Sequence, residues 1–217
     1  MKRGYDSYKD SGVKWIRDIP TRWSRSKLKY LTIKNVQYGI NTSSDSYIKN
    51  GIRFIRTTDI DDFGNLKKDG VKVDSDNIDE SLITDYLDFL VSRSGTLGKT
   101  YLHISDRRMT YGGYLVRFNF GEVTISKFIQ YYCHTNSFWE WISLNTVTST
   151  IGNVNGQKYS NMEVPIPPLS EQQQIVSYLD TKTSLIDSLI QKTQRKIELL
   201  KEKRTSLINE VVTKGLN

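Results

Sequence analysis

The sequence predicts an α+β (mixed α/β) domain followed by one long C-terminal coiled-coil helix. Two observations predict this class. Residues 47–114 alternate apolar and polar positions between glycine and aspartate punctuation, which is typical of short strands and turns. After Pro168 neither glycine nor proline occurs until Gly215, and the apolar residues recur every three or four positions. We expect the folded domain to span residues 1–164 and the helix residues 165–217.

The first 34 residues are basic, with ten Lys and Arg against three Asp. Residues 1–11 are polar, and we expect them to be loosely held. Residues 13–23 contain Trp15 and Trp23 as well as two isoleucines, which predicts an arm fixed by its aromatic side chains to a larger surface. Residues 24–34 carry leucines on one face and several lysines, which predicts a short basic helix.

The middle of the chain predicts strands, turns and one helix in succession. We expect strands at residues 52–56, 87–92, 101–104 and 115–118, turns at 61–65 and 111–114, a glycine-containing loop at 93–100, a helix at Thr124 to Leu144 and a polar loop at 148–160.

The C-terminal segment has the repeat of a helix that pairs with another helix. Proline cannot occupy a helix interior, so residues 165–168 exclude an earlier start, and Ser170 is the expected N-cap. About 43 residues then form a rod of roughly 64 Å, too long to be buried on a domain of this size. The predicted apolar contacts of the helix pair are Val176, Leu179, Ile186, Ile190, Ile197, Leu200, Leu207 and Val211, with Thr183, Thr193 and Arg204 as polar positions of the same 3.5-residue repeat.

Composition restricts the partners and the compartment. The formal net charge of +7 favours an anionic partner. The single Cys133 excludes an internal disulfide, and we expect a buried neutral thiol. Neither a run of 18 apolar residues nor a signal peptide is found, which predicts a cytoplasmic protein without a membrane partner.

No catalytic or metal-binding constellation is found in the sequence. Gly98-Lys99-Thr100 resembles the end of a phosphate-binding P-loop, but Arg93 stands where that motif needs a glycine. His103 and His134 are the only histidines, and with one cysteine they cannot supply a recognisable metal-ligand set. No Glu-x-Lys motif of a metal-dependent nuclease occurs. We therefore predict that the chain is not an enzyme and binds no metal.

Several polar loops predict a DNA-binding surface. Arg, Lys, Asn and Gln side chains hydrogen-bond to base edges, and hydroxyls and backbone amides position phosphates. Composition alone leaves open that these loops are simply solvated. The candidate DNA-contacting residues are Arg53, Arg56, Thr57, Arg93, Ser94, Thr96, Lys99, Tyr111, Tyr114, Asn153, Gln157 and Lys158.

The chain resembles the DNA-specificity (S) subunits of Type I restriction-modification systems from about Val13 to Gly215. The resemblance is carried by motifs that are weak singly and strong together and in order. They are residues 13–23, Phe54-Ile55-Arg56 with Asp59-Ile60, residues 92–96, Gly152 with Gly156-Gln157 and Asn161, residues 166–172, Leu179-Asp180 with Thr183 and Ile186-Asp187, and residues 199–204.

The resemblance implies a target recognition domain that reads one half of a split DNA sequence, and a helix that sets the spacing between halves. Family members usually carry two such units, whereas one is present here, so the chain is either a natural half-subunit or a truncated one. We expect an antiparallel homodimer and a palindromic bipartite target.

The resemblance also implies the partners. They are adenine methyltransferase (M) subunits, which bind S-adenosylmethionine, and a motor-nuclease (R) subunit, so that S-adenosylmethionine, ATP and Mg are expected on those partners and no cofactor on this chain. Trp15, Trp23 and residues 165–179 are the hypothetical docking region for the methyltransferase. Three alternatives stay open: a coiled-coil scaffold, a decoy fragment that binds partners without directing modification, and pairing with a different S polypeptide.

Overall fold

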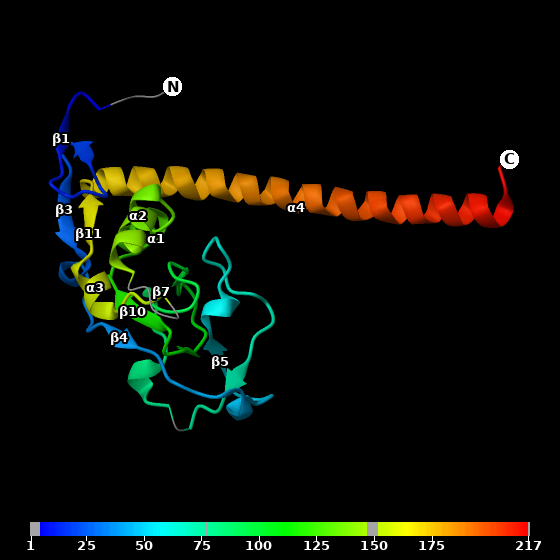
Figure 1. Ribbon diagram of the computed structural model, residues 1–217, viewed down its shortest axis with the longest axis horizontal. Coiled ribbons are helices and arrows are strands. Elements are labelled where there is room, and N and C mark those ends of the chain that lie inside the picture. Colours follow the sequence, from blue (N-terminus) through cyan, green and yellow to red (C-terminus); the bar gives the residue numbers. More distant parts are fainter. Residues whose placement is uncertain (1–4, 77, 147–151, 217) are drawn as a thin grey trace. The chain divides into compact units, whose positions relative to one another are not determined.

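The computed structural model describes residues 5–76, 78–146 and 152–216 (Figure 1). The chain divides into two compact units, Met1–Gln173 and Gln174–Asn217. In the described residues the first unit holds the strands, three α-helices and the first turn of α4, and the second unit is the remainder of α4. The α+β class and the long C-terminal helix are confirmed. The predicted domain boundary after residue 164 falls inside β11 (Glu163–Ile166), within the first unit.

The central sheet has four antiparallel strands in the order β4-β10-β7-β8. They are β4 (Gln37–Tyr38), β10 (Leu115–Asn119), β7 (Asp88–Ser92) and β8 (Thr100–Leu102). Every residue of β7 and β10 is buried, because both faces of these strands are covered. The strands predicted from residues 87–92, 101–104 and 115–118 are confirmed, with the second strand starting one residue earlier and ending two residues earlier than predicted.

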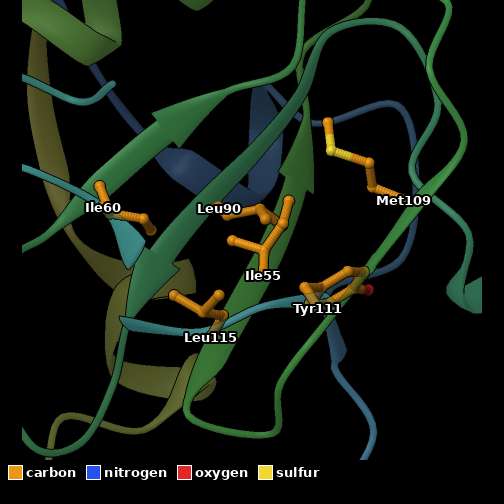
Figure 2. Close-up of a cluster of buried hydrophobic side chains, with 6 residues drawn as sticks. All are labelled: Ile55, Ile60, Leu90, Met109, Tyr111 and Leu115. Carbon is orange, nitrogen blue, oxygen red and sulfur yellow. The ribbon is translucent and has the colours of Figure 1, made fainter. Parts of the chain in front are cut away.

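A second sheet packs its apolar side chains against the first. It has the order β6 (Lys72–Val73), β5 (Ile52–Ile55) and β9 (Met109–Tyr111), with β5 and β9 parallel. Figure 2 shows the shared core, in which Ile55, Ile60 and Met109 contact residues of the central sheet. The predicted turn at residues 61–65 is confirmed, because the Asp61 carboxylate accepts hydrogen bonds from two backbone amides of that turn.

The N-terminal segment corrects two expectations. Residues 8–10 are not loosely held but form β1 (Tyr8–Asp10), which pairs with β2 (Asp18–Pro20). Residues 24–34 are not a basic helix: they begin with β3 (Ser24–Lys27), which pairs with β11. The physical reason is the partner strand β11, which pairs with residues 136 to 142 positions earlier in the chain, satisfies the backbone of residues 24–27 and competes with local helix formation. Short 3₁₀ helices complete this region and the loops: Leu28–Tyr30, Ser44–Ser46, Thr57–Asp59 and Glu80–Leu82.

The predicted aromatic arm is confirmed. Val13, Ile16 and Ile19 form a buried cluster against which Trp15 and Trp23 pack. The Trp15 indole N–H donates to the carbonyl of residue 163 at 3.2 Å, and the Trp23 indole N–H donates to the carboxylate of residue 171 at 3.0 Å. Both tryptophans are therefore partly buried and keep their polar atoms hydrogen-bonded.

The helix predicted from Thr124 to Leu144 is two helices, α1 (Val123–Tyr132) and α2 (Asn136–Asn145). Thr135 separates them by capping α2, since its hydroxyl accepts the Phe138 amide hydrogen at 3.3 Å. The predicted burial of Cys133 is confirmed, and burial raises the pKa of its thiol, which favours the neutral form.

A third helix, α3 (Gly156–Asn161), replaces the end of the predicted loop at 148–160. Asn155 caps it, because its side-chain oxygen accepts the Lys158 amide hydrogen at 2.9 Å. Residues 147–151, including the polar Ser149 and Thr150 of that loop, lie outside the described residues.

The long helix α4 (Leu169–Lys214) has 46 residues, roughly 69 Å at 1.5 Å per residue. It begins before Ser170, so the predicted Ser170 cap is wrong. The Pro168 carbonyl accepts the first hydrogen bonds of the helix, from the Glu171 and Gln172 amides, at 2.9 Å each. Proline suits this position because its missing amide hydrogen would have no partner in a first turn. In the described part of the chain no helix combines the length and apolar character needed to span a membrane.

His103 predicts a dependence of stability on pH. Its side chain is 1% exposed, and burial lowers the pKa of the imidazole below its ordinary value of 6.5, partly offset by nearby aspartates. As the pH falls, the imidazole of the unfolded chain is protonated at a higher pH than the imidazole of the folded chain. The free energy of unfolding is therefore unaffected by His103 above about pH 7 and decreases below about pH 6.5. The free energy of unfolding, measured with urea at pH 7.5 and at pH 5.5, should fall less between these two pH values in His103→Gln than in the native chain. The two decreases should differ by at most about 1.4 kcal/mol per pH unit. Equal differences in both proteins would contradict this.

Candidate nucleic-acid interface

Three loops that carry predicted DNA-contacting residues meet at one end of the central sheet. Ser94 pairs with Asn153 in an isolated antiparallel bridge. The Arg93 amide donates to the Tyr114 carbonyl at 2.8 Å, and the Val154 amide donates to the Arg93 carbonyl at 2.9 Å. Segments about 60 residues apart in the sequence are therefore adjacent. We define the loop surface as Arg93, Ser94, Thr96, Tyr114, Asn153, Gln157 and Lys158.

The β7–β8 loop is held in one conformation. The Ser92 hydroxyl donates to the Thr96 carbonyl at 2.7 Å and accepts the Lys99 amide hydrogen at 2.9 Å. Gly98 has a φ of +74°, and a Cβ atom there would lie 2.6 Å from the Trp139 ring, so only glycine fits this turn. The loop therefore presents its side chains from a rigid scaffold, as binding loops commonly do.

The guanidinium of Arg93 lies over an aromatic ring of this region. The guanidinium carbon is 4.8 Å from the centroid of the Tyr38 ring, and Nη1 donates to the Gly113 carbonyl at 3.3 Å. The Tyr38 hydroxyl in turn accepts the Gly156 amide hydrogen at 2.9 Å. Sequence reasoning missed Tyr38, because its place beside residues 93 and 156 follows from the strand order and leaves no local signal.

Arg53 and Arg56 lie on another element and have internal partners. Arg53, on β5, donates to the carbonyls of residues 67, 68 and 69 at 3.1 to 3.4 Å. Arg56 makes a bidentate pair with Asp59 through Nε at 3.0 Å and Nη2 at 2.8 Å. Burial raises the pKa of the Asp59 carboxyl, but the hydrogen bonds from Arg56 outweigh it and the net pKa is lowered, so the pair is ionised. The guanidinium groups of both arginines hold the loop that follows β5.

Two other candidates belong to the core. Tyr111 is 0% exposed and packs in the cluster of Figure 2, and Thr57 is also buried. Burial excludes both side chains from a contact surface in this structure, which corrects the prediction for both. Ser94, at 7% exposed, is buried as well, and it joins the loop surface through its backbone bridge to Asn153. Lys99 forms an ion pair with Asp62, and Lys158 donates to the Asn145 carbonyl, so these two ammonium groups have partners close to the loop surface.

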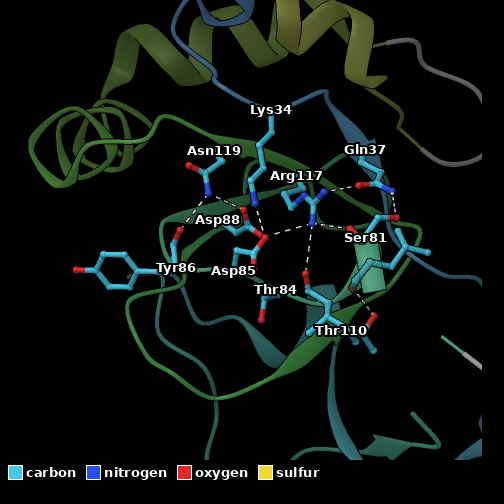
Figure 3. Close-up of polar contacts among 12 residues, drawn as sticks. Lys34, Gln37, Ser81, Thr84, Asp85, Tyr86, Asp88, Thr110, Arg117 and Asn119 are labelled. Carbon is cyan, nitrogen blue, oxygen red and sulfur yellow. Dashed lines mark hydrogen bonds and ion pairs between the residues drawn. The ribbon is translucent and has the colours of Figure 1, made fainter. Parts of the chain in front are cut away.

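A buried polar network, which sequence reasoning did not identify, joins β7 and β10 near the end of these strands that lies opposite the loop surface (Figure 3). The Asp88 carboxylate accepts from Arg117 at 3.4 Å, from the Asn119 side chain at 2.8 Å and from the Asp85 amide at 2.8 Å. Arg117 also donates to the Ser81 carbonyl at 2.8 Å. Asp88 and Arg117 are 0% and 6% exposed at their side chains, so the network fixes β7 against β10. Among the residues that the structure describes, no cluster of three or more His, Cys, Asp or Glu could hold a metal ion.

Comparison with known proteins identifies the family. Residues 22–199 match the family model described as Type I restriction modification DNA specificity domain, and the chain belongs to this family. This confirms the resemblance seen in the motifs. The family match also agrees with the prediction that the chain is a specificity subunit. Such a subunit is non-catalytic.

Solved structures show the same fold. A chain from a structural study of complex assembly and conformational transition of the type I R-M system matches with a TM-score of 0.70 and 18% identity, over 96% of this chain and 49% of that one. The HsdS subunit from Thermoanaerobacter tengcongensis matches at 0.62 and 19%, over 96% and 48%. The Type-I restriction-modification system S subunit from M. genitalium matches at 0.55 and 18%, over 87% and 45%. The present chain spans about half the length of each.

Proposed function

We propose that this chain reads one half of a bipartite DNA target for a Type I restriction-modification system. The observation that carries the proposal is the meeting of the predicted β7–β8 loop, the 111–114 turn and the start of α3 at one loop surface. The exposed side chains of Thr96, Tyr114 and Gln157 and the partly exposed guanidinium of Arg93 offer the hydroxyl, amide and guanidinium groups that bind base edges and phosphates. Membership of the specificity family and the net charge of +7 support a DNA ligand.

We further propose that α4 pairs with α4 of a second copy, in antiparallel orientation. Ile186, Ile190 and Leu207 are each more than half exposed, and Val176 is buried. Leu185, Leu189 and Leu199, outside the predicted repeat, are 48 to 56% exposed as well, so the apolar surface is wider than a minimal coiled-coil contact. A continuous apolar face of this kind is stabilised by burial against another helix. Two-fold symmetry would place one recognition domain at each half of a palindromic bipartite target.

The proposed partners follow from the function. The chain recruits adenine methyltransferase subunits and a motor-nuclease subunit, which carry S-adenosylmethionine, ATP and Mg, while the chain itself binds no cofactor. The arm with Trp15 and Trp23, hydrogen-bonded to residues 163 and 171, is the proposed docking region of the methyltransferase.

The salt dependence of DNA binding tests the proposed function. Phosphate contacts release counterions, so the logarithm of the affinity should fall linearly with the logarithm of the salt concentration. If each domain makes three to five phosphate contacts, the pair makes six to ten, and we expect a loss of affinity of about 1000-fold or more between 50 and 200 mM salt. Fluorescence anisotropy with duplex DNA measures this. Weak binding that does not change with salt would contradict the proposal and favour a protein scaffold.

A further inference from the structure

Arg93 differs from the other two candidate arginines in what its guanidinium contacts. Arg53 donates to three backbone carbonyls and Arg56 forms a bidentate pair with a carboxylate. Within the described part of the chain Arg93 makes one side-chain hydrogen bond, the 3.3 Å contact to the Gly113 carbonyl. A guanidinium carries five N–H donors. Arg93 therefore has terminal N–H donors available for a ligand, whereas Arg53 and Arg56 donate to groups within the domain.

Tyr38 supports this guanidinium from one face. The centroid of its ring lies 4.8 Å from the guanidinium carbon, and the Gly156 amide fixes the ring by donating to its hydroxyl at 2.9 Å. A Cβ atom at position 156 would lie 3.0 Å from the Tyr38 hydroxyl oxygen, so glycine permits this close approach. Stacking on an aromatic face orients the flat guanidinium before a ligand arrives and lowers the entropy lost on binding.

The neighbours of Arg93 suit a base edge. Tyr114 is 56% exposed and shares a backbone hydrogen bond with Arg93, and the Ser94–Asn153 bridge lies next to it in the chain. No carboxylate forms an ion pair with Arg93 among the described residues, in contrast to Arg56. A planar pair of donors matches the O6 and N7 acceptors of guanine in the major groove, and this is the commonest specific arginine contact.

We propose that Arg93, stacked on Tyr38, reads a guanine of the half-site, with Tyr38 as its positioning residue. The inference rests on the proposed DNA-reading function and adds the base class, the residue that reads it and the residue that orients it. It also separates the three candidate arginines: Arg93 contacts the base, and Arg53 and Arg56 shape the loop after β5.

A binding selection from a randomised duplex library, using the full chain, provides the test. The native chain should select a G·C pair at one position of each half-site. Arg93→Ala should lose the preference at that position alone, by about 5-fold to about 140-fold, which corresponds to one bidentate base contact. Arg107→Ala removes an equal charge from an exposed site outside the loop surface and should leave every preference unchanged.

Arg93→Gln and two Tyr38 variants distinguish base reading from a structural role. Glutamine pairs with adenine, so Arg93→Gln should shift the preference at that position from G·C towards A·T. Tyr38→Phe keeps the ring and should keep the guanine preference. Tyr38→Leu removes the ring and should weaken that preference several-fold, while the other positions and the melting temperature stay close to native.

The outcomes separate the inference from the function on which it rests. A native chain that selects no sequence overturns both. A native chain that selects a bipartite sequence, with Arg93→Ala weakening all sequences equally, makes Arg93 a phosphate contact and overturns the inference alone. Retention of the G·C preference in Arg93→Ala and Arg93→Gln also overturns it.

Discussion

Asp88→Ala should destabilise the recognition domain by about 3–5 kcal/mol, the effect of breaking a buried ion pair from one side. The carboxylate of Asp88 is 0% exposed and accepts hydrogen bonds from Arg117, the Asn119 side chain and the Asp85 amide. Its removal leaves a buried guanidinium without its countercharge and two donors without their acceptor. Urea unfolding should show a lower midpoint with an unchanged slope.

Glu80→Ala is the matched control, because Glu80 also pairs with an arginine, Arg108, but both side chains are largely exposed. Solvent-screened pairs contribute little to stability, so the midpoint should stay close to native. Equal, small shifts for Asp88→Ala and Glu80→Ala would contradict the structural role assigned to the buried network.

Ile190→Asp combined with Ile197→Asp should convert a dimer of the chain into monomers. The two side chains are 53% and 42% exposed on α4, and in the proposed pair they are buried against the second helix. In a symmetric dimer each substitution occurs twice, so four carboxylates would have to be desolvated. We expect the dissociation constant to rise by about 1000-fold or more, measured by analytical ultracentrifugation across a concentration series.

Ser188→Asp with Gln191→Asp adds the same charge to the same stretch of helix outside the 3.5-residue repeat. This variant should remain dimeric. Circular dichroism should give similar helix content for both variants, so that a change in assembly is not a change in folding. A monomeric native chain, or dimerisation that survives Ile190→Asp with Ile197→Asp, would refute helix pairing through this face.

The sequence predicted those helices and strands whose residues near one another in the chain form a clear apolar pattern. The 46 residues of α4 follow from the apolar repeat and the absence of glycine and proline, and β7 follows from a compact apolar run. β3 could not be predicted, because its strand conformation depends on pairing with β11 from the far end of the domain. The start of α3 did leave a signal, the capping residue Asn155, which the polar composition around it obscured.

The candidate site was predicted as a set of loops but not as an arrangement. The order β4-β10-β7-β8 brings Tyr38 to Arg93, and no spacing in the sequence encodes that contact. Along β10, Arg117 and Asn119 alternate with apolar residues, a pattern that normally indicates a solvated strand face, and in β7 Asp88 precedes the apolar run. Both faces are buried here, so these polar residues bond to one another.

A methylation map of DNA from cells that carry only this chain and its cognate methyltransferase subunit tests the central claim most directly. The proposed function predicts one palindromic bipartite motif with methyladenine on both strands, because two identical recognition domains would then act on one site. An asymmetric bipartite motif would mean that another chain supplies the second recognition domain. Absence of methylation, with the complex shown to form, would contradict the half-site function and leave a decoy or a scaffold.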